Sequence, residues 1–315
     1  MADFLMHILL SDDVLEKIES RRVLEGIQRY RTLYRLGAQG PDPLFFYEFI
    51  SGGKRSPLRE LGHTMHKKHT GAFLKMGFSR LQKVSWEQEW LELAAYLSGF
   101  ICHFTLDRLI HPYVYWAAEN WIWSVDGRLV STTHQAVEMA LDVLFWKERR
   151  MSSACKVKTR KYVDIGRQWP KSVRDFLLEA FASLYGVRAD EKSLNRVLSD
   201  FYRGHDLLYD PRGWKKELVG WLDAFTGGGI KPPKVPYPAL LDETVDWANR
   251  KRRTWTHPFK AGEAHRESVD EILSKASFEA ANHINGVFAG ILKGEPIDGL
   301  FPDLSYDTGL PCDGP

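Results

Sequence analysis

The stretch ICHFTLDRLIHPY, residues 101–113, places His103, Asp107 and His111 four residues apart in an otherwise apolar run. Four residues of an α-helix turn through about 400°, so these three side chains climb one face of a helix with a slow drift. Three titratable groups that face the same way cost stability unless they share a partner. The stretch therefore predicts a helix that carries a site for a ligand common to all three groups.

A second stretch, HQAVEMALDVLFWKERR, runs from residue 134 to residue 150 and repeats this spacing. His134, Glu138 and Asp142 stand at the same interval, so two helices can bring their polar ladders together in the core of a bundle. Imidazole and carboxylate groups suit zinc, iron or manganese. Three scattered cysteines argue against a cysteine-rich zinc site. The sequence thus predicts a metal centre with histidine and carboxylate ligands.

Helical periodicity dominates the chain. We expect one long or two short helices over 4–36, a helix over 58–82, one from a Ser85–Gln88 capping box to Pro112, and one after a Thr132–Gln135 capping box. Further helical patterns occupy 170–186, 190–203, 212–225, 238–250 and 266–292, with a loop over 226–238. Because no segment alternates with period two between hairpin turns, we expect an all-α multi-helix bundle with additional C-terminal helices.

The composition changes toward basic and small residues over 147–161, which marks a candidate domain boundary. It would separate a metal-binding helical core, residues 1–150, from a C-terminal helical region, residues 151–315, packed on that core. The alternative is one continuous domain.

The overall composition, 44% hydrophobic and 13% aromatic, is typical of an ordered globular protein. A formal charge of +2 does not favour nucleic acid as a partner, and the basic runs at 147–161 and 250–253 are best interpreted as solvated loops, although they could meet phosphates. The N-terminal sequence has no secretory-signal pattern, and no uncharged apolar run reaches the ~20 residues of a membrane span. We therefore expect a cytoplasmic protein with reduced thiols, whose oligomeric state the sequence leaves open.

Four segments together carry a family likeness: GPDP at 40–43, GHTMH at 62–66, GFICHFTLDRLIHPY at 99–113 and HQAVEMALD at 134–142. In this order they resemble the zinc-dependent phospholipase C family, which shares its helical fold with the single-strand-specific zinc nucleases. The likeness covers roughly residues 5–145. The later segment WTHPFKAG is compatible with a C-terminal region of that family.

The resemblance implies a cluster of three zinc ions against an all-α core. The implied metal ligands are His7, Asp42, His66, His103, Asp107, His111, His134 and Glu138. Within this set Asp107 would bridge two metals, and Asp42 would also act as general base. His63 and His69 are rivals of His66 for the histidine that precedes the HxxxD motif. Asp142 would be an outer group that orients a ligand, or a capping carboxylate.

The chain departs from the family pattern at two places. The secreted enzymes bind the third metal through a processed N-terminal tryptophan, whereas this chain begins Met-Ala-Asp, so a third metal would need Asp3, Asp12 or the free terminus. Pro43 follows Asp42, where choline-selective enzymes have an aromatic residue. The second departure argues against phosphatidylcholine recognition and leaves the metal cluster intact.

The resemblance implies a metal-dependent phosphoric-ester hydrolase with two or three zinc ions, and the ligand types leave iron and manganese as alternatives. Its substrate would be a lipid head group, a nucleotide or another phosphate ester. One alternative is a nuclease or small-molecule phosphodiesterase on the same fold. Another is a non-catalytic protein that the metal stabilises and that binds a partner through its C-terminal helices.

Overall fold

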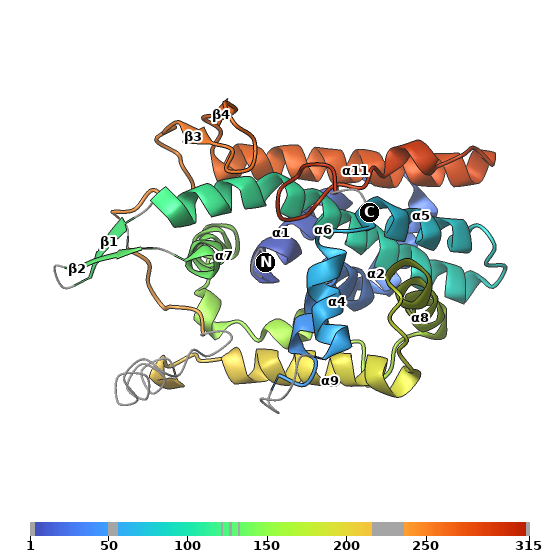
Figure 1. The fold of residues 1–315 in the computed structure, drawn as a ribbon. Coiled ribbons are helices and arrows are strands. Elements are labelled where there is room, and N and C mark those ends of the chain that lie inside the picture. The colour runs from blue at the N-terminus through green and yellow to red at the C-terminus, as the bar shows by residue number, and fades with distance from the viewer. Residues whose placement is uncertain are drawn as a thin grey trace.

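A computed structural model describes residues 4–49, 56–120, 122–125, 128–131, 133–215, 236–242 and 244–312. Helices account for most of this structure, as Figure 1 shows, so the predicted all-α fold is confirmed. The only regular strands among the described residues form two small antiparallel pairs: β1 (Ile122–Val125) with β2 (Arg128–Ser131), and β3 (Trp255–Thr256) with β4 (Ala264–His265). The sequence had indicated neither pair.

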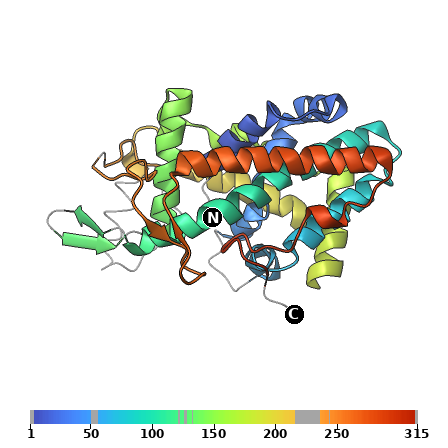
Figure 2. The same ribbon diagram turned by 90° about the horizontal axis from the view of Figure 1, so that it is seen from above.

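Helix α6, Glu87–Asn120, is the centre of the bundle, and most of its side chains are buried. The helices around it are α1 (Phe4–Leu15), α2 (Arg21–Arg29), α3 (Arg31–Gly37), α4 (Pro57–Met65), α5 (Thr70–Leu81), α7 (His134–Arg150), α8 (Lys171–Tyr185), α9 (Glu191–Leu208) and α11 (Val269–Lys293). Short 3-10 helices occupy Asp42–Phe46 (η1), Ala154–Lys156 (η2), Thr159–Tyr162 (η3) and Asp298–Leu300 (η4). Figures 1 and 2 both show the long α11 beside α6, with which it is in contact.

One contiguous hydrophobic core contains side chains from both halves of the chain. Phe73, for example, packs on Phe100 of α6 and on Phe176 of α8. Among the described residues, no helix combines the length and the apolar character that a membrane crossing requires. The core therefore joins sequence-distant helices around α6.

Several predicted helices are present with revised boundaries. The 4–36 region forms three helices, and 58–82 forms two, because His69 adopts a left-handed φ of 55° between α4 and α5. Helices α8 and α11 agree with the predicted 170–186 and 266–292, and α9 runs beyond 203 to Leu208. Thr133 caps α7, whereas the predicted capping residue Thr132 lies outside the described residues. Most of the predicted 212–225 helix and most of the 226–238 loop also lie outside them. Helix α6 begins at Glu87, one residue later than a Ser85 cap implies.

The predicted end of α6 at Pro112 is wrong, since the helix continues to Asn120. Proline cannot donate the hydrogen bond to the carbonyl of Arg108, a loss of about 3 kcal/mol in a helix interior. The next turn offsets that loss by burying Tyr113, Val114 and Ala117 completely. Burial of the apolar side chains thus outweighs the local effect of the proline.

The predicted 238–250 helix is also wrong, because residues 236–242 and 244–250 form turns and bends. Asp242 accepts hydrogen bonds from the backbone N–H and hydroxyl of Thr244, and Asp246 accepts from the backbone N–H groups of Arg250 and Lys251. Such local side-chain bonds to the backbone compete with helical bonds. The apolar periodicity of this segment reflects burial of Trp247 and Ala248 rather than a helix.

Two glycines allow α3 and α6 to approach each other closely. A Cβ atom at Gly99 would lie 1.9 Å from the carbonyl oxygen of Tyr34, and one at Gly37 would lie 2.2 Å from that of Tyr96. Both clashes involve backbone atoms, which cannot swing aside as a side chain does. The two glycines therefore set the distance between α6 and the segment that leads to Asp42.

We expect Gly99→Ala to destabilise the protein by about 1–3 kcal/mol, the usual cost of overpacking a core. Gly299→Ala is the matched control, because a Cβ at Gly299 would meet nothing within 4 Å. It should change the free energy of unfolding by less than about 0.5 kcal/mol. Denaturant unfolding of the two variants measures the difference, and equal stabilities would contradict the close-packing explanation.

Candidate metal centre

Three groups of buried histidines and carboxylates lie close enough to hold metal ions. They are His7 with His103 and Asp107; Asp42 with His66 and His103; and His111 with His134 and Glu138. Helix α1 contributes His7, the start of η1 contributes Asp42, and His66 follows α4. Helix α6 contributes His103, Asp107 and His111, and α7 contributes His134 and Glu138. All eight side chains of the predicted ligand set therefore lie in these groups.

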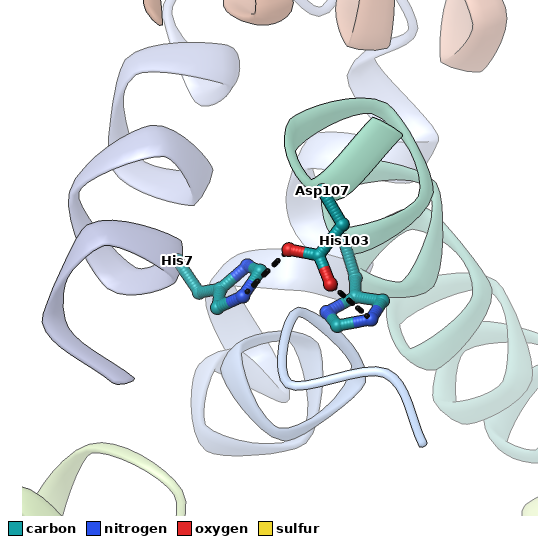
Figure 3. Close-up of side chains that lie close together, drawn as sticks. All are labelled: His7, His103 and Asp107. Atoms are coloured by element: carbon teal, nitrogen blue, oxygen red, sulfur yellow. Dashed lines mark ion pairs between the residues drawn. The ribbon is translucent and has the colours of Figure 1, made fainter. Parts of the chain in front are cut away.

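The carboxylate of Asp107 lies between histidines from different elements. Its Oδ1 is 3.2 Å from Nε2 of His7, and its Oδ2 is 3.2 Å from Nε2 of His103. Figure 3 shows the carboxylate between these two rings, which also stack at 4.7 Å. The Oδ2 atom is in addition 3.8 Å from Nε2 of His66, which lies 3.3 Å from Oδ1 of Asp42. Asp107 of the first group thus also lies close to His66 of the second group, and His103 belongs to both groups.

The third group sits one helical turn further along α6. Nε2 of His111 is 3.1 Å from Oε1 of Glu138, and Nε2 of His134 is 2.9 Å from the same oxygen. His134 and Glu138 are four residues apart on α7, as the ladder predicted. His134 is the most exposed of the three, with 23% of its side chain accessible. This group therefore lies nearest to the surface.

Main-chain carbonyls fix the orientation of two rings. Nδ1 of His66 is 2.7 Å from the carbonyl oxygen of Gly62, and Nδ1 of His111 is 2.8 Å from that of Tyr306. A carbonyl can only accept a hydrogen bond, so Nδ1 must be the protonated nitrogen in both rings. In the neutral ring the lone pair then lies on Nε2, which is the nitrogen that faces the carboxylates.

Because Nδ1 carries the proton in both rings, a positive charge is needed between each Nε2 and the carboxylate that faces it. The lone pair on Nε2 of His66 faces Asp42, and that of His111 faces Glu138, so electron pairs would meet across these gaps without a positive charge between them. A proton or a metal ion supplies that charge. Histidine ligands of metals commonly donate their other ring N–H to a carbonyl in this manner. The ring tautomers therefore suit metal binding through Nε2.

The first two groups also contain polar atoms without hydrogen bonds. Across the ranges that the structure describes, both ring nitrogens of His7 and His103 and both oxygens of Asp107 lack hydrogen-bond partners, although all three side chains are fully buried. Such atoms are costly to bury. Ligands about 2.0–2.1 Å from a tetrahedral zinc are ~3.3–3.4 Å apart, which is close to the separations measured here. The donors present fit zinc in type and in spacing.

The electrostatics keep three donors, His103, Asp42 and Asp107, in the protonation states that metal binding needs. Burial, reinforced by the neighbouring His7 and His66, lowers the pKa of His103 to about 3 against the opposing effect of Asp107. Burial alone would raise the pKa values of Asp42 and Asp107, but the surrounding imidazoles outweigh it and lower both. At neutral pH the site therefore presents a neutral His103 between two ionised carboxylates.

The nearby carboxylates favour a positive charge at Nε2 of His66 and of His111. Burial lowers the pKa values of His66 and His111, but Asp42 raises that of His66 and Asp107 raises that of His111, and the net effect in each is an increase. For Glu138, burial raises the pKa and the adjacent His134 and His111 rings help to lower it overall. A cation at each Nε2 is therefore stabilised by the ionised carboxylates.

The sequence suggested that Asp142 is either an outer group that orients a metal ligand or a capping carboxylate, and its hydrogen bonds are those of a cap. Its two oxygens accept hydrogen bonds from the backbone N–H groups of Leu5 and Met6 at 2.8 Å and 2.6 Å, and one of them also accepts from the hydroxyl of Tyr237 at 2.5 Å. These bonds tie the first turn of α1 to α7. Asp142 therefore positions His7 by fixing its helix.

Three further candidates do not join the groups. His63 is exposed and packs on Phe45, and the exposed His69 packs on Tyr185. Asp12 forms ion pairs with three arginines, Arg31, Arg35 and Arg150. Of the three histidines in this part of the sequence, only His66 points into the centre. Asp3 and the free terminus, the other suggestions for a third metal, lie outside the described residues.

Comparison with known families identifies the chain. A family model described as zinc dependent phospholipase C matches residues 6–192, which is more than half of the sequence and includes every residue of the three groups. The chain belongs to the zinc-dependent phospholipase C family. This confirms the resemblance seen in the sequence, and membership assigns the protein to the broad class of metal-dependent hydrolases. Neither the curated proteins nor the solved structures yielded a match.

Sequence reasoning missed the two carbonyl acceptors of Gly62 and Tyr306. Every residue has a main-chain carbonyl, so the residue type carries no signal for this role. Sequence reasoning also missed Gly40, which has a φ of 54° and lies against the ring of His103. For Gly40 a signal did exist, because GPDP is a turn sequence in which glycine supplies a left-handed conformation.

We expect Gly40→Ala to displace His103 and to lower the amount of metal bound. A Cβ at this position would lie 2.1 Å from the ring, and the residue has a positive φ. Gly166→Ala is the control for the backbone strain alone, since Gly166 has a φ of 92° with nothing within 4 Å of the added atom. Elemental analysis of both purified variants measures the effect. Full metal content in Gly40→Ala would show that the ring of His103 is not held as described.

Proposed function

We propose that this member of the zinc-dependent phospholipase C family hydrolyses a phosphodiester with two or three zinc ions. The observation that carries the proposal is the orientation of His66 and His111, whose Nε2 lone pairs face carboxylates 3.3 Å and 3.1 Å away. Buried carboxylates and imidazoles in this relation need a cation between them. The family match supports zinc as that cation.

The donors divide into sets that fit separate ions. Asp42, His66, His103 and one oxygen of Asp107 would hold the first ion, which gives zinc its preferred four ligands. The other oxygen of Asp107 would hold a second ion together with His7. His111, His134 and Glu138 would hold a third. Since three protein ligands and an open position are characteristic of catalytic zinc, this last set suits substrate binding.

The reaction class follows from the chemistry of clustered divalent ions. When bound, such ions neutralise phosphate charge and lower the pKa of a bound water towards ~7. The protein's part is to hold the proton acceptor in place. Asp42 is 5% exposed and its lowered pKa keeps it ionised, so it is able to orient an attacking water and accept its proton.

Aromatic side chains near His134 suggest where the substrate enters. The ring of Tyr115 lies 4.3 Å from that of His134, and Phe259, which is 44% exposed, packs on Tyr115 at 5.1 Å. An apolar edge beside the most exposed group suits an acyl chain, and it suits a stacked base equally well. The family match makes a phospholipid the leading substrate class, and a nucleotide or other phosphodiester is the alternative.

A structural metal centre is the second candidate function, and one observation favours it. Every member of the three groups except His134 is buried, including the complete α6 ladder at 0% exposure. A site so enclosed is also what a metal-stabilised interaction protein would have. The two candidates differ in turnover, because both bind metal.

Asp107→Asn should abolish metal binding and hydrolysis together, because the amide weakens the ligand that would bridge two ions. Asp200→Asn is the control, since Asp200 is a similarly buried carboxylate that accepts a hydrogen bond from the backbone N–H of Glu48 and pairs with Arg196 and Arg203. Metal analysis and hydrolysis of a chromogenic phosphodiester are the measurements. An Asp107→Asn protein that retains its full metal content would contradict the assignment of this bridge.

Removal of metal by EDTA should lower the melting temperature as well as stop turnover. Ligands that bind only the folded state stabilise it, by about 2.7 kcal/mol at a free concentration one hundred times Kd. Returning zinc should restore both properties. Restored stability without turnover on lipid, nucleotide or generic esters would support the structural candidate. No change on either treatment would refute both.

A further inference from the structure

We propose that residues 301–312, here called the C-terminal strap, are a working part of the metal centre that holds His111 in its metal-binding orientation. This inference rests on the proposed metal binding. The strap begins more than one hundred residues after the end of the segment that matches the family model, residues 6–192. Its role is therefore one that the family match does not assign.

The main chain of one strap residue bonds to two residues of the centre. The carbonyl oxygen of Tyr306 accepts a hydrogen bond from Nδ1 of His111 at 2.8 Å, and the N–H of Tyr306 donates to the carbonyl oxygen of His66, also at 2.8 Å. Ser305 adds a hydroxyl bond to the same oxygen of His66 at 3.3 Å. Tyr306 thereby links His66, which follows α4, to His111 on α6.

The side chain of Tyr306 closes the same region. It is 1% exposed, and its ring meets those of His66 at 5.4 Å and His103 at 5.2 Å, both nearly edge to face. A side chain in this position excludes water from the rings behind it. The residue thus contacts donors from all three groups of the metal centre.

Several contacts fix the strap independently of Tyr306. The carboxylate of Asp303 accepts from the backbone N–H groups of Gly71 and Ala72 at the start of α5, at 2.7 Å and 3.0 Å. The N–H of Cys312 donates to the carbonyl of Asp303, which closes the strap into a loop. Gly309 has a φ of 66° and packs against Arg108 of α6. Because the strap is held at both ends, it can support the ring of His111 in a fixed position.

The chemical effect of the strap is to fix a tautomer. With the Tyr306 carbonyl in place, the proton of His111 stays on Nδ1 and the lone pair stays on Nε2, towards Glu138. Without this acceptor, the ring can rotate or carry its proton on Nε2. Loss of such a supporting bond typically costs 10- to 100-fold in metal affinity. The ion held by His111, His134 and Glu138 should be the one affected.

A different role for the strap would be a lid that blocks the centre until it moves away. The hydrogen bonds argue against that role, because moving the strap would remove the acceptor that orients His111. The two roles make opposite predictions for a displaced strap. A support, once displaced, weakens metal binding, whereas a lid, once displaced, leaves metal binding intact and raises turnover.

Gly309→Ala tests the proposal without removing any contact residue. The added Cβ would lie 2.4 Å from the carbonyl oxygen of Arg108 and should push the strap away from α6. Gly294→Ala is the matched control, with a similar φ of 68° and nothing within 4 Å of the added atom. Titration with Co²⁺, followed by the visible absorption of the bound metal, measures the affinity of each site for Co²⁺. We expect Gly309→Ala to bind the His111 ion about 10- to 100-fold more weakly, and Gly294→Ala to bind as the unaltered chain does.

A double-mutant comparison separates positioning from general loss of stability. In a His111→Ala background, Gly309→Ala should cause no further loss of cobalt affinity, because the group that the strap orients is already absent. A chain that ends at Pro302 provides a second variant, and it should lose the same ion. Equal affinities of Gly309→Ala and Gly294→Ala, or full metal binding with raised turnover in the shortened chain, would overturn the proposal. Failure of the unaltered chain to bind Co²⁺ or Zn²⁺ would instead overturn the proposed function, and this inference with it.

Discussion

A carboxylate with no exposed surface, that of Asp107, is the constraint on which the arrangement of the helices depends. Its two oxygens face the Nε2 atoms of His7 and His103, and His66 lies slightly further away. Burying an ionised carboxylate is expensive unless positive charge compensates it. A neutral imidazole such as His103 does not supply that charge, but it supplies a ligand for a cation that does. This unfavourable burial is therefore consistent with a metal ion at the centre, and the family match adds that the protein is a metal-dependent hydrolase.

The surrounding fold brings sequence-distant groups to that carboxylate and holds them there. Close contact between α3 and α6, which Gly37 and Gly99 permit, carries the chain to Asp42. Asp142 fixes the first turn of α1 and with it His7. The strap joins His66 to His111 from the other end of the chain. Each of these supports acts on a different ligand, so the centre depends on packing across the whole molecule.

The sequence predicted those parts of the site whose spacing is local. His103, Asp107 and His111 share a helix face because the helical repeat alone puts them there, and the same holds for His134 and Glu138. The choice of His66 over His63 and His69 came from the resemblance, and helix geometry alone would not have settled it, because α4 ends at Met65. The role of the Tyr306 carbonyl as an acceptor for His111 could not be predicted, because every residue type has a main-chain carbonyl.

Errors in the predicted helices have a similar origin. Pro112 by itself predicts the end of a helix, but burial of Tyr113 and Val114 in the next turn stabilises the continued helix. Residues 238–250 have helical periodicity, yet the side chains of Asp242 and Asp246 take the backbone N–H groups that a helix would use. Local propensity and tertiary packing disagree at these points, and packing or side-chain bonding decides the outcome.

Anomalous X-ray diffraction at the zinc edge, from crystals of protein purified without chelators, would locate zinc beside Asp107. We expect anomalous peaks about 2.0–2.2 Å from the oxygens of Asp107 and from Nε2 of His66 and His111. Crystals that show no peak there, with these nitrogens instead bonded to water or to protein acceptors as imidazolium ions, would contradict this expectation.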